Sequence, residues 1–104
     1  MAQKIYTLPA VTISTAGTPV PLTTNAGIIG TSIIIAADKA NTGKIYLGGV
    51  GVSSANGQEL DPGDTFEIVA DSLNGRNQEI FLSEIYLDTE TNNNIARIQY
   101  LRYK

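Results

Sequence analysis

The sequence predicts an all-β protein, a small antiparallel β-sandwich or jelly-roll-like barrel that forms a single domain over residues 1–104. Short runs rich in Ile, Val, Tyr, Phe and Thr are separated by clusters of Gly, Pro, Asn and Asp, a spacing typical of sandwiches and barrels. No segment repeats apolar residues at convincing helical spacing. A chain of 104 residues suffices for one hydrophobic core and is too short for two.

We expect nine strands in this domain. They are residues 4–8, 11–14, 20–23, 32–37, 44–47, 51–53, 65–70, 84–87 and 95–103. The stretch 16–21 is interrupted by prolines, and because proline cannot donate to a sheet ladder, this stretch should run along an edge or form an arm. We therefore expect residues 1–22 to form an N-terminal arm or an edge segment, which pairs within the domain or reaches another chain.

The strand at residues 32–37 contains Ile33, Ile34 and Ile35, an apolar run without alternation. Successive side chains of a strand point to opposite faces, so a continuous apolar run indicates a strand that is covered on both sides. We expect this strand to be central in the fold or capped by a neighbouring subunit.

Three other strands alternate between apolar and polar residues, which indicates their buried faces. Tyr46 and Tyr86 lie opposite the apolar residues of their strands, so we expect both at the surface or at a protein contact. The last strand carries large side chains on both faces, and one of these faces is a candidate interface. The expected core residues of the three alternating strands are Ile45, Leu47, Phe66, Ile68, Ala70, Ile85 and Leu87.

The residues of the turns specify their conformations. In Asp61-Pro62-Gly63-Asp64, Pro62 fits the second position of a type II turn, and Gly63 accepts the positive φ required at the third. Asn56-Gly57 and Asn74-Gly75 are dipeptides typical of tight hairpins or bulged loops. The polar run at residues 89–94 indicates a loop tip.

Composition excludes many functions. The chain has no cysteine and no histidine, which removes disulfides, thiolate metal sites, thiol catalysis and every triad that depends on imidazole. Its net charge of -3 disfavours nucleic acid as a partner, and the basic residues Arg97, Arg102 and Lys104 at the end of the chain indicate a solvated strand end. No stretch approaches the ~20 apolar residues that cross a bilayer, and the chain begins without a secretory signal. We expect a soluble protein, made in a cytoplasm, that binds no membrane.

Carboxylates are the only abundant catalytic residue type, and we find no convincing site among them. A carboxylate pair suits a glycosidase, but two phenylalanines and five tyrosines leave little to line a sugar cleft. The order Asp88-x-Glu90-x-Asn92 resembles an EF-hand loop, yet Asn93 and Gln99 replace its glycine and its bidentate glutamate. The glycine-rich run 48–51 precedes neither a helix nor a Lys-Ser/Thr pair, so it is not a phosphate loop. We expect no enzyme activity, no cofactor and no metal.

The order of four motifs resembles a pattern in small virion proteins of tailed bacteriophages. These motifs are Asn41-Thr42-Gly43-Lys44-Ile45-Tyr46-Leu47-Gly48, Ser53-Ser54-Ala55-Asn56-Gly57, Leu60-Asp61-Pro62-Gly63-Asp64 and Glu84-Ile85-Tyr86-Leu87-Asp88. The resemblance covers residues 30 to 101. It implies a head decoration (cement) protein that stabilises the capsid by binding the major capsid protein and copies of itself, as a dimer or trimer. It also leaves open a tail, baseplate or fibre component, or an adaptor. A carbohydrate-binding sandwich is a third interpretation.

Candidate contact residues follow from expected exposure on strand faces. The N-terminal segment can reach a neighbour's sheet, because an edge strand adds to another sheet through backbone hydrogen bonds. The candidates are Lys4, Tyr6 and Leu8, then Ile33, Ile34 and Ile35, and finally Arg97, Leu101 and Tyr103.

Overall fold

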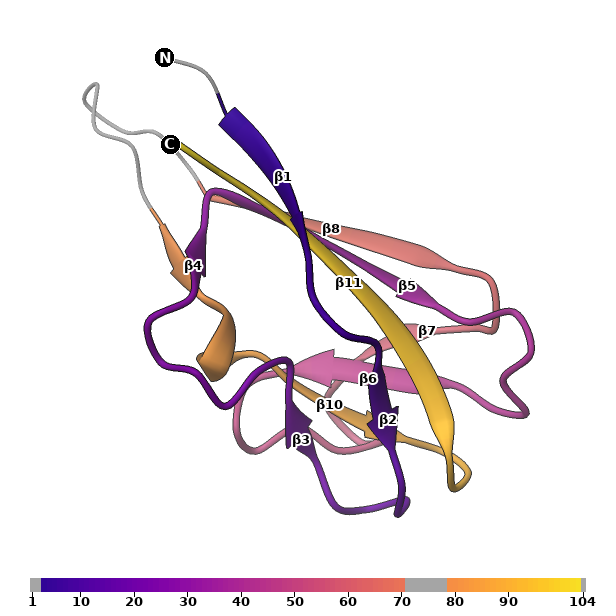
Figure 1. Ribbon diagram of the computed structural model, residues 1–104. Coiled ribbons are helices and arrows are strands. Elements are labelled where there is room, and N and C mark those ends of the chain that lie inside the picture. Colours follow the sequence, from indigo (N-terminus) through magenta and orange to yellow (C-terminus); the bar gives the residue numbers. More distant parts are fainter. Residues whose placement is uncertain (1–2, 71–78, 104) are drawn as a thin grey trace.

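The computed structural model describes residues 3–70 and 79–103 and confirms the all-β prediction. Figure 1 shows a β-sandwich-like arrangement of antiparallel sheets, elongated along the long C-terminal strand. The expected turn at Asn74-Gly75 lies outside the described residues. Within the described ranges, no helix is long and apolar enough to span a membrane.

The first sheet has five strands and is built around the C-terminal strand. The strand order is β1-β11-β5-β8, with β2 also pairing β11. The strands are β1 (Gln3–Thr7), β2 (Val11–Ile13), β5 (Ser32–Ala37), β8 (Thr65–Val69) and β11 (Asn94–Tyr103). All of these pairs are antiparallel.

The second sheet has four strands in the order β3-β10-β6-β7. They are β3 (Val20–Pro21), β6 (Ile45–Gly48), β7 (Gln58–Leu60) and β10 (Tyr86–Thr89). A two-stranded sheet of β4 (Ile29–Gly30) and β9 (Ile80–Phe81) lies beside them, followed by the short 3-10 helix η1 (Leu82–Glu84). The core fills the space between the two larger sheets. Its fully buried members include Ile33, Ile35, Ile45, Leu87 and Ile98.

Some expected strand positions are wrong. Residues 51–53 form no strand, and β7 pairs with β6 instead, although its sequence Gln58-Glu59-Leu60 is mostly polar. It is an edge strand with one buried residue, so it carries little apolar signal. The strand expected at residue 84 begins at Tyr86, because Leu82–Glu84 form a 3-10 helix.

The expectation that Tyr46 lies at the surface is also wrong. Tyr46 is only 5% exposed, because the loop that follows β6 folds back against it. Gly57 permits this close approach: a Cβ at residue 57 would lie 2.7 Å from the Tyr46 Cβ and 2.8 Å from Cγ2 of Val52. Tyr86 is half-buried. Alternation therefore identifies the face of a strand correctly, while a folded-back loop decides whether that face meets water.

Residues 3–21 are built into the sandwich and do not extend away from it. β1 and β2 both pair with β11, and β3 pairs with β10 in the other sheet. β1 is the last strand on its side of the five-stranded sheet (Figure 1). β3 is likewise the last strand on its side of the four-stranded sheet.

The polar run at residues 89–94 is a hydrogen-bonded corner between the two sheets. Asn94 is 2% exposed, and its amide nitrogen donates to the Gly43 carbonyl at 3.2 Å and to the Thr89 hydroxyl at 2.8 Å. Its amide oxygen accepts the backbone N–H of Thr42 at 3.0 Å. Asn93 adopts a positive φ of 68° in the turn before it. One asparagine thus fixes the loop that follows β5 against the loop that follows β10.

The turn at Pro62-Gly63 has the expected geometry. Gly63 has a φ of 90°, and the backbone N–H of Asp64 donates to the carbonyl of Asp61 at 2.9 Å. These are features of a type II turn. The turn also joins β8 to β5, because the N–H of Gly63 donates to the Ala37 carbonyl at 3.0 Å.

Gly63→Val is expected to lower the free energy of unfolding by about 1–3 kcal/mol, because a β-branched residue is strained at positive φ. Gly49→Val is the matched control, since Gly49 has no positive φ and a Cβ at residue 49 would meet no atom within 4 Å. Denaturant unfolding of the two variants measures the difference. Equal stabilities would contradict the assigned role of the turn.

Candidate interaction face

The outer face of the five-stranded sheet is the candidate functional surface. The registers place Ile5 beside Leu101, Leu101 beside Ser32, and Ser32 beside Val69 in one row across the sheet. The next row runs from Thr7 through Gln99 and Ile34 to Glu67. These residues alternate with the inward-facing residues of their strands, so their side chains share the outer side.

This face exposes several large apolar side chains. Ile5 is 68% exposed, Val69 is 64% exposed and Ile34 is 37% exposed, while Leu101 is half-buried. They lie on four neighbouring strands, β1, β8, β5 and β11. Single exposed apolar residues are ordinary, but a contiguous group on a sheet face is typical of an interaction surface.

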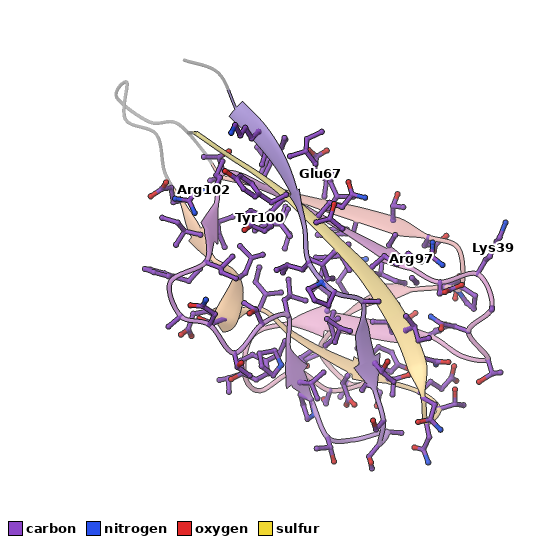
Figure 2. The ribbon with its side chains drawn as sticks, viewed as in Figure 1. Lys39, Glu67, Arg97, Tyr100 and Arg102 are labelled. Carbon is purple, nitrogen blue, oxygen red and sulfur yellow. The ribbon has the colours of Figure 1, made fainter. Side chains whose placement is uncertain are left out.

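Polar groups interrupt and border this apolar surface. The Ser32 hydroxyl donates to Oε2 of Glu67 at 2.8 Å across the β5–β8 pair. At the far end of β11, Arg97 lies 3.3 Å from Oδ2 of Asp38. The backbone N–H of Ala40 and the charge of Arg97 hold the pKa of Asp38 below its ordinary value. Figure 2 shows Glu67 and Arg97 along the sheet, with Lys39 at its end.

The N-terminal candidates face mainly inward. Tyr6 is half-buried, and its ring stacks on the buried Tyr100 with 5.2 Å between ring centroids. Leu8 packs against the core, and the guanidinium of Arg102 lies 5.9 Å from the centre of the Tyr6 ring. Lys4 is exposed. The aromatic pair therefore fastens β1 to the sheet.

The isoleucine run of β5 alternates in the structure, although its sequence does not. Ile33 and Ile35 are fully buried, whereas Ile34 reaches the outer face. β5 lies inside its sheet, between β11 and β8, as expected. Among the described residues, the chain covers the inner face of β5 and leaves its outer face open. Ile33 and Ile35 therefore cannot serve as surface contacts in this fold, and only Ile34 remains a candidate.

Two candidates on the last strand lie on the outer face. Arg97 is exposed and Leu101 is half-buried, and both follow the alternation expected from the sequence. Tyr103 occupies the next outer-face position of β11, opposite Gln3, and its side chain lies outside the described residues. The structure thus brings Ile34, Arg97 and Leu101 onto one surface.

Sequence reasoning missed the two most exposed apolar residues of this face, Ile5 and Val69. The alternation of residues 65–69 places Val69 opposite Phe66 and Ile68, and this signal was sufficient to identify it. In the N-terminal segment, the candidates from sequence were Lys4, Tyr6 and Leu8, which alternate with Ile5 along the chain. Tyr6 and Leu8 pack inward, so the side chain of Ile5 points to the outer face.

A polar hollow lies on the other sheet, beside Tyr46, and is lined in part by Asp88 and Glu90. Burial raises the pKa of the Tyr46 hydroxyl, and the negative charge of Glu90 adds to this effect. The oxygens of the EF-hand-like pattern are used internally: Asp88, Glu90 and Asn92 accept the backbone N–H groups of Gly17, Lys44 and Ala16. Within residues 3–70 and 79–103, no three Asp or Glu side chains gather as a metal site would require.

Comparison with known proteins finds no matching family model and no similar curated protein.

Proposed function

We propose that this chain is a non-catalytic structural protein of a bacteriophage virion. In this proposal it is a capsid decoration protein that stabilises the head by binding the major capsid protein. The observation that carries the proposal is the exposed apolar group on the outer sheet face, formed by Ile5, Ile34, Val69 and Leu101. The motif order that resembles small phage virion proteins supports the choice of partner.

The physical basis of attachment is burial of this apolar face. Removing apolar surface from water contributes about 25 cal/mol per Å² of area. The polar border, with Arg97 and Glu67, sets the orientation of the contact, because charged rims give specificity more than affinity. Many copies on a symmetric shell then stabilise it through avidity, even when each contact is modest.

The experiment is binding of the purified chain to capsids that lack it. Ile34→Lys and Val69→Lys are each expected to lower the affinity by about tenfold or more, since each buries a charge at the interface. Val50→Lys is the matched control, because Val50 is 71% exposed and lies in the loop after β6. All three variants should keep the stability of the parent chain.

The number of copies on a particle separates decoration from the alternatives. Hundreds of copies on the outer capsid surface are the expected result. A handful of copies at the neck or tail would replace the decoration role with a tail, baseplate or fibre role. Capsid binding that is unaffected by both outer-face variants would contradict the proposed surface.

A further inference from the structure

β1 and β8 are the longest edge strands of the five-stranded sheet, and neither has a partner on its outer side among the described residues. β8 pairs only with β5, and β1 pairs only with β11. The N–H of Ala37 bonds the Asp64 carbonyl, and the N–H of Ala70 bonds the Thr31 carbonyl. Backbone groups alternate in direction along a strand. The residues between these positions, Thr65, Glu67 and Val69, therefore direct their N–H and C=O groups to the open edge.

The same reasoning identifies the backbone N–H and C=O groups of β1 that point away from β11. The N–H of Leu8 bonds the Ile98 carbonyl, so Leu8, Tyr6 and Lys4 direct their backbone groups toward β11. Ile5 and Thr7 then direct theirs to the open side. β1 and β8 are both five residues long, so each presents a short free edge.

The β8 edge lacks the features that normally prevent strand addition. Its sequence, Thr-Phe-Glu-Ile-Val, contains no lysine or proline, and its only charged residue is Glu67 on the outer side. Natural edge strands are usually protected by lysine, proline or a bulge, and an unprotected edge is a site for pairing with another chain. The exposed Val69 adds apolar surface at this edge.

The two edges carry opposite charge. β1 contains Lys4, and the neighbouring position on β11 is Arg102, so this edge is basic. β8 contains Glu67 and follows Asp61 and Asp64 in the turn, so that edge is acidic. Opposite charges favour the approach of the β1 edge of one copy to the β8 edge of another. Like charges disfavour the approach of two β1 edges or of two β8 edges. The chemistry of each edge thus selects the other edge as its partner.

The strand directions also agree. Each neighbouring pair in the order β1-β11-β5-β8 is antiparallel, so β1 and β8 run in opposite directions. A second copy that continues the sheet in the same orientation therefore places its β1 antiparallel to β8 of the first. With Ile5 opposite Val69, Thr7 lies opposite Glu67. In both pairs, the backbone N–H and C=O groups that point to the free edges can then bond each other. The exposed side chains of Ile5 and Val69 also meet.

We propose that copies of this chain associate head to tail, with β1 of one copy added antiparallel to β8 of the next. The contact is heterologous, so its repetition forms a closed ring or an open filament. It also continues the outer face, with its apolar residues, from one copy to the next. This inference concerns the free chain and holds whether or not the proposed virion role is correct.

The first experiment is disulfide trapping with Ile5→Cys/Val69→Cys. The chain has no cysteine of its own, so only the introduced thiols react. Within one copy these positions are separated by β11 and β5, three spacings of about 4.8 Å or roughly 14 Å, too far for a disulfide. Mild oxidation is expected to give trimers and larger covalent species on a denaturing gel.

Three controls make the trapping specific. The single variants Ile5→Cys and Val69→Cys should stop at dimers, and the pair Ile5→Cys/Val50→Cys should give at least tenfold less of the larger species. Equal yields from the two cysteine pairs would overturn the proposal, as would an Ile5→Cys/Val69→Cys chain that remains monomeric.

The second experiment tests the register through charge. Thr7→Glu places a carboxylate opposite Glu67 and should weaken association by about tenfold in sedimentation equilibrium. Thr7→Glu/Glu67→Lys should restore it, because the charges are then opposite. Glu67→Lys alone controls for loss of the Ser32 hydrogen bond. A parent chain that is monomeric up to millimolar concentration, or a double variant that is no better than Thr7→Glu, would overturn this pairing.

Discussion

Ile35→Ala is expected to lower the free energy of unfolding by about 3 kcal/mol, within the roughly 2–5 kcal/mol typical of such core truncations. Ile35 is fully buried at the centre of β5, between β11 and β8. Truncation removes its apolar contacts and leaves a cavity that the two neighbouring strands prevent from closing. Chemical denaturation monitored by circular dichroism measures the loss.

The adjacent residue provides the control. Ile34→Ala removes the same atoms from the same strand, but Ile34 faces outward and is 37% exposed. Its expected cost is below about 1 kcal/mol, as for most surface positions. Similar costs for the two variants would mean that the outer face of β5 is covered in solution, which the proposed assembly or another partner would have to explain.

Asn94→Ala is expected to destabilise the protein by about 3 kcal/mol, because buried polar groups lose their partners. The carbonyl of the buried Gly43 loses a donor, and the partly buried N–H of Thr42 loses its acceptor. Both groups lie at the corner where the loops from the two sheets meet. The shift in the midpoint of thermal unfolding is the measurement.

Asn92→Ala is the matched control for this corner. The side chain of Asn92 accepts one hydrogen bond, from the backbone N–H of Ala16, at an exposed site where water can replace it. We expect a cost below about 1 kcal/mol. If the two variants lose similar free energy of unfolding, the burial of the Asn94 hydrogen bonds adds nothing to stability.

Much of the fold could be predicted from the sequence, because alternation and turn residues are local signals. The strand at Ser32–Ala37 has the expected bounds, and the Pro62-Gly63 turn has the expected dihedral angle. The two-residue strands β4 and β9 were not predictable, since so short a segment shows no period. The burial of Tyr46 depends on a loop that is remote from any periodic pattern.

The candidate surface was only partly predictable, because strand register and strand order are not local signals. Ile34 and Leu101 were identified as apolar residues on strands with two large faces. Alternation alone identifies Val69 as an outward-facing residue. That Ile5 and Val69 share one face with Ile34 and Leu101 follows from the register of four strands, which the sequence does not specify. The identity of the open edges is likewise a property of strand order, which arises from pairing over long sequence separations.

The pairing of Gln3 with Tyr103 has a practical consequence for protein engineering. Because these positions are neighbours across β1 and β11, the start of β1 and the end of β11 lie together at one end of the molecule (Figure 1). Peptides joined at Gln3 and at Tyr103 would leave the sheet from the same place. The sandwich is therefore suited to display, and a short linker between Gln3 and Tyr103 would permit circular permutation.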